Sequence, residues 1–176
     1  GVYSGGYDLE TAEIFSMIRQ EGITGFTIVA GDRHAFWAGY PSETLPPKAF
    51  DPVGVEFITG SISAQTAGEV QQLTLKKDAP LRPLYVHDGP DGAMESSLGL
   101  TLMHGIRSAF VLSETGDPAR ARAARNPELA PHLAFVDHAG NGYATVRATP
   151  AELETEFVCI PVPLERRETD DGGPLR

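Results

Sequence analysis

The chain has 176 residues, of which 41% are hydrophobic, and these values suit one folded domain and argue against a disordered chain. Fourteen Lys and Arg against 24 Asp and Glu give a formal net charge of −10, which disfavours nucleic acid as a structural partner, because a duplex-binding protein must neutralise phosphates. The apolar runs are far too short for a transmembrane segment, and we recognise no targeting signal in this chain.

The first part of the chain predicts a helix and then a buried strand. Asp8 is placed to cap the start of the helix and Gly22 to end it. Apolar side chains recur between them at helical spacing, at Leu9, Ala12, Ile14, Phe15 and Ile18. Residues 26–30 are apolar on both faces, which predicts a strand buried between two layers.

The middle of the chain predicts loops around one further strand. Residues 41–52 form a proline-rich loop, residues 55–62 a second strand, and residues 64–92 mostly loop. We expect both loops to shape access to a site and to carry no metal ligand. Residues 98–113 then predict one buried helix.

The last third predicts a short helix and an antiparallel meander. Residues 118–125 form the helix, with Asp117 as its cap. Three strands of an antiparallel meander are expected after it, over residues 133–137, 143–148 and 152–160, with a turn at residues 139–142. These elements predict an α+β or layered α/β fold. Residues 1–164 form its single domain, and residues 165–176 form a polar tail that leaves the core.

Cys159 is the single cysteine, which excludes an internal disulfide and a cysteine-built zinc site. It lies on one face of the last expected strand together with Thr155 and Phe157. This position favours a small buried side chain over a nucleophile.

The segment after the first strand carries the strongest candidate for chemistry. Asp32 and His34 are two residues apart, so an extended backbone would point both side chains the same way, toward a shared metal ion or ion pair. The alternative is that Asp32 caps a turn and His34 is a hydrogen-bonded loop histidine. Two ligands are also incomplete, because a catalytic metal needs three or more protein ligands.

Other charged and titratable residues are weaker candidates. His104 and Arg107 lie one helical turn apart and either face phosphate or pack the helix and form a surface ion pair. Arg33 should point away from the two candidate ligands, and a salt bridge is its expected role. His132 and His138 are expected to be structural.

Residues 31–39, Gly-Asp-Arg-His-Ala-Phe-Trp-Ala-Gly, resemble the last metal motif of the alkaline phosphatase D (PhoD-like) family. That family belongs to the calcineurin-like metallophosphoesterases. Residues 54–63, 102–108, 126–133 and 135–143 resemble later blocks of the same family, in family order. Together these blocks span most of the chain, so the resemblance is more specific than the Asp-x-His spacing alone.

The resemblance implies an αββα sandwich around a dinuclear metal centre, with Asp32 and His34 as metal ligands. It implies hydrolysis of phosphate monoesters or diesters by a metal-activated water. Iron with calcium is the implied metal pair, with other divalent cations such as Mn or Zn as substitutes. A secreted or periplasmic location is also implied by the family.

The family's earlier motifs carry an Asp-x-His, a Gly-Asp segment and an asparagine, and they are not found in this sequence. We therefore expect residues 1–164 to be the carboxyl-terminal part of one metallophosphoesterase domain. A second chain or an upstream segment would carry the other metal ligands, and the chain alone would be inactive. The alternative is a non-catalytic binding or subunit-assembly module derived from the same fold.

Overall fold

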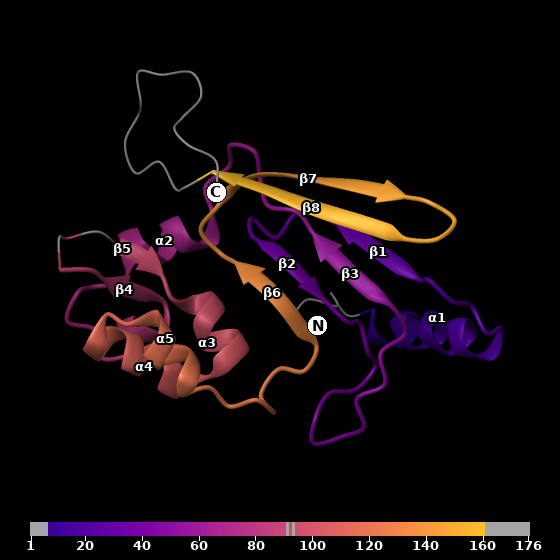
Figure 1. Ribbon diagram of the computed structural model, residues 1–176, viewed down its shortest axis with the longest axis horizontal. Helices are drawn as coiled ribbons and strands as arrows, with labels where there is room; N and C mark the ends of the chain where they lie inside the picture. The colour runs from indigo at the N-terminus through magenta and orange to yellow at the C-terminus, as the bar shows by residue number, and fades with distance from the viewer. Residues whose placement is uncertain (1–6, 91, 93, 161–176) are drawn as a thin grey trace.

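The computed structural model describes residues 7–90, 92 and 94–160, and shows a mixed α+β fold (Figure 1). The predicted polar tail, residues 165–176, lies outside the described residues. In chain order the elements are α1 (Asp8–Gln20), β1 (Thr27–Ala30), β2 (Phe36–Gly39), β3 (Val55–Ile58), α2 (Ala67–Thr74), the 3₁₀ helix η1 (Arg82–Leu84), β4 (Val86–Asp88), β5 (Met94–Ser96), α3 (Leu98–His104), α4 (Ile106–Thr115), α5 (Pro118–Ala123), β6 (Leu133–Asp137), β7 (Asn141–Ala148) and β8 (Leu153–Ile160).

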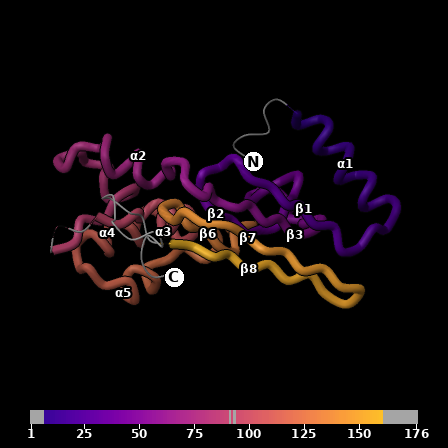
Figure 2. Tube along the Cα trace, turned by 90° about the horizontal axis from the view of Figure 1, so that it is seen from above, coloured from indigo at the N-terminus to yellow at the C-terminus, as the bar shows by residue number. Residues whose placement is uncertain are grey.

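A four-stranded sheet lies at the centre, with strand order β1-β3-β2-β6. Strand β3 pairs in parallel with β1, while β2 runs antiparallel to both β3 and β6. Strands β1, β3 and β6 therefore run in the same direction, and their carboxyl ends lie at one edge of the sheet. Helices α2 to α5 gather at one end of the molecule and α1 lies at the other (Figures 1 and 2).

The hairpin of β7 and β8 packs on this sheet through aromatic side chains. The ring of Phe157 on β8 lies 5.4 Å from Phe36, 6.3 Å from Phe57 and 5.7 Å from Phe135, centroid to centroid. Each of these three rings comes from a different strand of the sheet. Phe36 is fully buried and lies in the core between the two layers, whereas Phe135 of the same cluster stays 41% exposed.

The predicted carboxyl-terminal meander is wrong, because β6 pairs with β2 in the central sheet while β7 and β8 form a separate hairpin that begins at Asn141. The cause is a turn after β6. The Asp137 carboxylate accepts hydrogen bonds from the backbone N–H groups of Ala139 and Gly140, at 2.9 and 3.1 Å. Such an Asx turn redirects the chain out of the sheet before the next strand starts.

The prediction that residues 26–30 form a strand buried between two layers is also wrong. Strand β1 lies at an edge of the sheet and pairs with β3. Its Val29 side chain is 59% exposed. The first two residues of β1 are half-buried and the last two, Val29 and Ala30, are exposed. Apolar residues on both faces of a short strand are thus compatible with an edge position.

Helix α1 ends as predicted and begins differently. Gly22 adopts φ 62° just beyond the helix, and the N–H groups of Gly22 and Ile23 bond to the carbonyls of Arg19 and Ile18. This is a Schellman motif, which needs the left-handed conformation that glycine adopts without strain. At the other end Asp8 is the first helical residue and Tyr7 is the N-cap, with no side-chain capping bond, so the predicted Asp8 cap is wrong.

Residues 64–92 contain regular structure where loop was predicted, namely α2, η1 and β4. The start of α2 is a capping box: the Thr66 hydroxyl accepts from the Glu69 N–H at 3.1 Å, and the Glu69 carboxylate accepts from the Thr66 N–H at 2.6 Å. The helix is only eight residues long, too short for a clear apolar period. The strand predicted at 55–62 is correspondingly shorter, since β3 ends at Ile58.

The single helix predicted over residues 98–113 is two helices, α3 and α4, separated by Gly105 with φ 98°. The predicted helix at 118–125 is confirmed as α5, and the Asp117 carboxylate caps it by accepting from the N–H groups of Ala119 and Arg120. Among the described residues no helix combines the length and apolar character needed to cross a bilayer.

Candidate functional site

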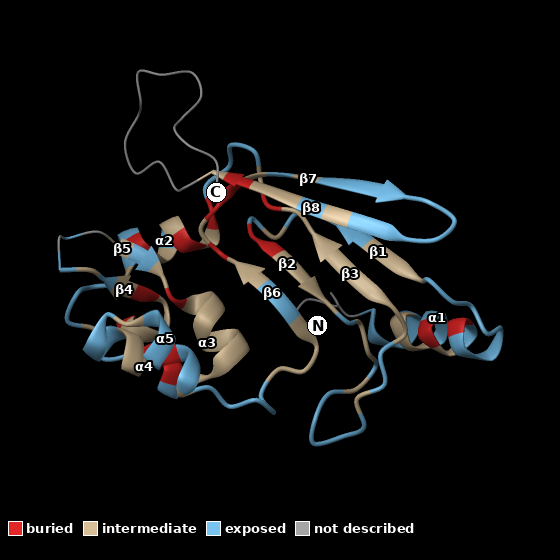
Figure 3. Cartoon of the chain, viewed as in Figure 1, coloured by how far each residue is buried: buried red, intermediate tan, exposed pale blue. Residues whose placement is uncertain are grey.

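Three loops meet at the edge of the sheet where β1, β3 and β6 end. They cover residues 31–35, 59–66 and 138–140, and backbone hydrogen bonds join them to the neighbouring strands and to α2. Thr59 N–H donates to the Ala30 carbonyl at 2.9 Å, and Gly142 N–H donates to the Ser61 carbonyl at 2.9 Å. Loops after parallel strand ends commonly hold ligand sites. Figure 3 shows buried residues where β2 begins and where β6 leads into β7.

Asp32 and His34 lie on the first of these loops and are both exposed. They are the two non-glycine residues with positive φ in the described part of the chain, at 68° and 50°. The backbone between the strands is therefore a tight turn, and the extended segment assumed for the Asp-x-His spacing is wrong. Left-handed non-glycine residues cost energy and cluster at functional sites, so the turn favours a functional role for this pair.

The imidazole of His34 is oriented by a backbone carbonyl. Its Nδ1 lies 2.6 Å from the carbonyl oxygen of Gln65, on the second loop. A carbonyl only accepts, so Nδ1 donates this bond, and Nε2 is the ring nitrogen that it leaves available to a ligand. Metal-binding histidines are typically held in this way, with one ring N–H on a carbonyl or carboxylate and the other nitrogen turned to the metal.

The described residues hold no group of three or more His, Cys, Asp and Glu side chains close enough to bind one metal ion. Asp32 and His34 thus fit a metal site as a carboxylate and an oriented imidazole, but only as part of its ligand set. A carboxylate with an imidazole suits several divalent and trivalent cations, so this pair alone does not select a metal.

Arg33, on the same loop as Asp32 and His34, contacts the Trp37 ring on β2. The guanidinium carbon of Arg33 lies 5.9 Å from the centroid of the Trp37 ring, within the range of a cation–π contact. On β2, Trp37 also packs edge-on against His138, with centroids 4.8 Å apart. Burial lowers the pKa of His138 to about 4, so its ring is neutral at physiological pH and packs as a structural side chain.

The other two histidine candidates, His104 and His132, belong to none of the three loops. Gly105 separates His104 on α3 from Arg107 on α4, so the predicted spacing of one helical turn is wrong. Burial lowers the pKa of His104 and also that of His132. Cys159 is buried, and burial raises the pKa of its thiol to about 11, which confirms the packing role predicted for it.

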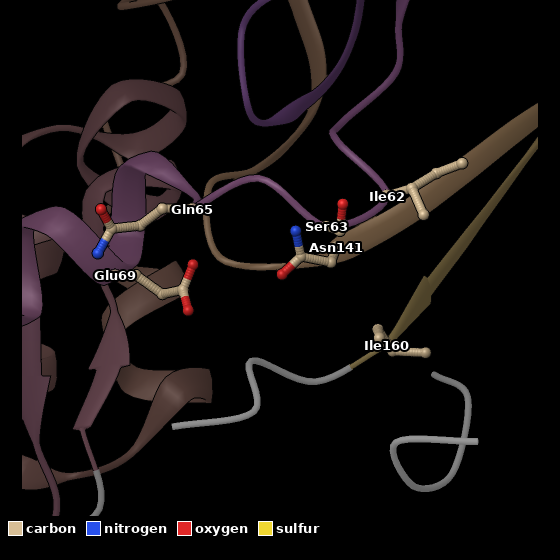
Figure 4. Close-up of a pocket in the computed structure, with 6 residues that line it drawn as sticks. All are labelled: Ile62, Ser63, Gln65, Glu69, Asn141 and Ile160. Carbon is tan, nitrogen blue, oxygen red and sulfur yellow. The ribbon is translucent and has the colours of Figure 1, made fainter. Parts of the chain in front are cut away.

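Sequence reasoning missed Asn141 and the second loop that it contacts. Asn141 is buried and donates from Nδ2 to the Ser61 carbonyl and hydroxyl, both at 3.2 Å, and to the Ala64 carbonyl at 2.9 Å. Beside it lies a pocket of about 440 Å³ (Figure 4) whose lining residues are Ile62, Ser63, Gln65, Glu69, Asn141 and Ile160. No local sequence signal predicts contacts between residues about 80 positions apart.

Comparison with known proteins identifies the chain at the level of a family. The model of the PhoD-like phosphatase family matches residues 3–157, which is most of the chain. No curated protein and no solved structure matches it. The matched range includes Asp32, His34 and the three loops at the sheet edge.

Proposed function

The chain belongs to the PhoD-like phosphatase family, and from this membership we propose that it hydrolyses phosphate monoesters or diesters at a centre of two metal ions. Asp32 and His34 are its metal ligands. The observation that carries this assignment is the hydrogen bond from His34 Nδ1 to the Gln65 carbonyl, which leaves Nε2 as the free ligand atom. The Asp32 carboxylate, exposed on the same turn, is suited to a hard cation.

The metal ions, iron with calcium or other divalent cations such as Mn or Zn, polarise the phosphoryl oxygens and lower the pKa of a water when bound. The residues of this chain hold the cations in place. Asp32 contributes negative charge and His34 a neutral nitrogen donor, and the hydrogen bond to Gln65 fixes the direction of that donor.

The remaining ligands come from a second chain or an upstream segment, which makes this chain the carboxyl-terminal part of an αββα metallophosphoesterase domain. The support is that the described residues bring no third metal-binding side chain to Asp32 and His34. Family membership further supports export to a secreted or periplasmic location. The chain alone is then inactive.

We expect the protein, purified with any chain that accompanies it, to hydrolyse a chromogenic nitrophenyl phosphate monoester or diester. A chelator should abolish the rate, because the metal ions generate the nucleophile, and added Fe, Ca, Mn or Zn should restore it. The assay is the release of nitrophenol measured with elemental analysis of the same sample. Full activity in a metal-free sample would contradict the proposal.

We also expect the chain alone not to remain a monomer. Val29 on the edge strand β1 and four further large apolar side chains of α1 and its flanks are exposed: Leu9, Ile14, Met17 and Ile23. An uncovered strand edge and apolar surface favour association. Sedimentation of the isolated chain tests this expectation, and a compact monomer that unfolds cooperatively would argue against a missing second part.

The alternative is a non-catalytic binding or assembly module, which the incomplete ligand set in the described residues also favours. An intact-mass spectrum of the native sample separates the two functions. A co-purifying chain with an Asp-x-His and an Asn-His motif supports the enzyme. A folded sample without such a chain supports the module.

A further inference from the structure

We infer that Asn141 is a positioning residue that acts on His34 through the loop of residues 61–65, an inference that rests on the proposed role of His34. Asn141 begins β7, whereas His34 lies between β1 and β2, more than 100 positions earlier. The second loop connects the two residues, because Asn141 bonds to its Ser61 and Ala64 and His34 bonds to its Gln65.

The contacts form a continuous path. The Asn141 Nδ2 group donates to the carbonyl and hydroxyl oxygens of Ser61, both at 3.2 Å, and to the Ala64 carbonyl at 2.9 Å. The next residue is Gln65, whose carbonyl accepts the Nδ1 proton of His34 at 2.6 Å. On one side this carbonyl is anchored by Thr66, which is fully buried and donates its N–H to the Glu69 carboxylate at 2.6 Å. On the other side its position depends on how firmly Ser61 and Ala64 are held.

Hydrogen bonds rather than apolar packing hold this loop. The Ile62 side chain is 75% exposed, and Ser63, Ala64 and Gln65 are exposed as well. Asn141 is only 6% exposed, and it lines the pocket together with Ser63 (Figure 4). A buried amide that binds backbone carbonyls of an otherwise exposed loop is well suited to fix its shape.

Other bonds to the loop explain why Asn141 affects orientation rather than folding. The Ser61 carbonyl also accepts from the Gly142 N–H at 2.9 Å, and the Ala64 carbonyl also accepts from the Ser61 hydroxyl at 2.8 Å. Both carbonyls keep a partner when the amide is removed. Loss of Asn141 thus loosens the loop at Ser61 and Ala64 without unfolding it, and allows the Gln65 carbonyl to shift relative to the His34 ring.

The test is ¹⁵N NMR of the His34 imidazole in the full chain, which reports which ring nitrogen carries the proton. The native protein should show the Nδ1–H form with slow solvent exchange of that proton. Asn141→Ala should speed this exchange about tenfold and shift the ring toward a mixture of both forms, because hydrogen bonds of ordinary strength are lost. The matched control is Gln72→Ala, which removes another buried amide, 5% exposed, that donates to the Met94 carbonyl at 3.1 Å.

Binding of Mn²⁺ alone, followed by paramagnetic broadening of the His34 ring signals, gives a second readout. Asn141→Ala should raise the Mn²⁺ dissociation constant about tenfold, the lower end of what is typical for residues that orient a metal ligand. If His34 binds no Mn²⁺ even in the protein purified with any chain that accompanies it, the proposed metal site fails, while the NMR result still decides the role of Asn141.

The inference is overturned if Asn141→Ala leaves the His34 ring form and proton exchange as in the native protein, or if Gln72→Ala changes them equally. If Asn141→Ala does not fold, the same test uses Asn141→Ser, which retains one hydrogen-bond donor. We then expect a change in the His34 ring form and proton exchange between those of the native protein and of Asn141→Ala. An unchanged His34 ring in folded Asn141→Ser would overturn the inference as well.

Discussion

Asp32→Asn and His34→Ala are expected to lower metal content and turnover together, each by at least about 10–100-fold, in the assembled enzyme. Asp32→Asn keeps the size of the side chain and removes the negative charge that holds a hard cation. His34→Ala removes the nitrogen donor that the Gln65 carbonyl orients. The measurement is elemental analysis beside the rate of phosphate ester hydrolysis for each variant.

The controls separate metal loss from damage to the turn. Both residues have left-handed backbone, which Asn adopts more readily than Ala, so His34→Asn tests the loss of the imidazole with less backbone strain. Asp78→Asn removes one carboxylate from an exposed turn and should change neither metal content nor rate. If Asp32→Asn or His34→Asn keeps full metal content and a near-normal rate, the segment is an ordinary loop.

The sequence predicts the end of a helix correctly where a single capping residue determines it. Gly22 after α1 and Asp117 before α5 act through bonds to residues within a few positions, so the sequence alone predicts them. The edge position of β1 and the departure of β7 from the sheet depend on pairing between distant strands. A one-dimensional pattern of apolar residues does not contain that pairing.

In the candidate site, too, the sequence predicted individual residues but not the contacts between distant segments. Its two candidate ligands, Asp32 and His34, were chosen from the sequence, although the turn that carries them is left-handed rather than extended. The groups that orient His34 were not predicted, because Gln65 contributes only a backbone carbonyl and Asn141 acts from the far side of the second loop. Backbone carbonyls have no sequence signature, so such contacts are found only in the folded structure.

Arg82→Ala is expected to destabilise the fold by about 2–3 kcal/mol. The Arg82 side chain is only 3% exposed and forms two parallel bonds to Asp88, from Nε to Oδ2 at 2.6 Å and from Nη2 to Oδ1 at 2.7 Å. Its Nη1 also donates to the Leu75 carbonyl at the end of α2. The variant removes these three bonds, a bond from Nη2 to the Met94 sulfur at 3.4 Å, and the link between α2, η1 and β4. Asp88 can turn to water because it is partly exposed.

The matched control is Arg147→Ala on the β7–β8 hairpin. Arg147 also pairs with carboxylates, Glu152 at 3.4 Å and Glu154 at 2.6 Å, but its side chain is 65% exposed. Exposed ion pairs contribute about 0–1 kcal/mol, so this variant should change stability little. Urea unfolding of the three proteins measures the difference, and equal losses for Arg82→Ala and Arg147→Ala would contradict the importance assigned to burial.

The effect of Arg82→Ala should also depend on pH. The hydrogen bonds from Arg82 hold the pKa of the Asp88 carboxyl below its usual value. A carboxyl with a lowered pKa in the folded state stabilises the fold fully above its unfolded pKa of about 4, and loses this contribution as the pH falls through the folded pKa. The stability difference between the native protein and Arg82→Ala should therefore shrink from about pH 7 to about pH 3. A difference that stays constant over that range would show that the Arg82–Asp88 charge pair does not contribute, leaving the bonds from Arg82 to the Leu75 carbonyl and the Met94 sulfur.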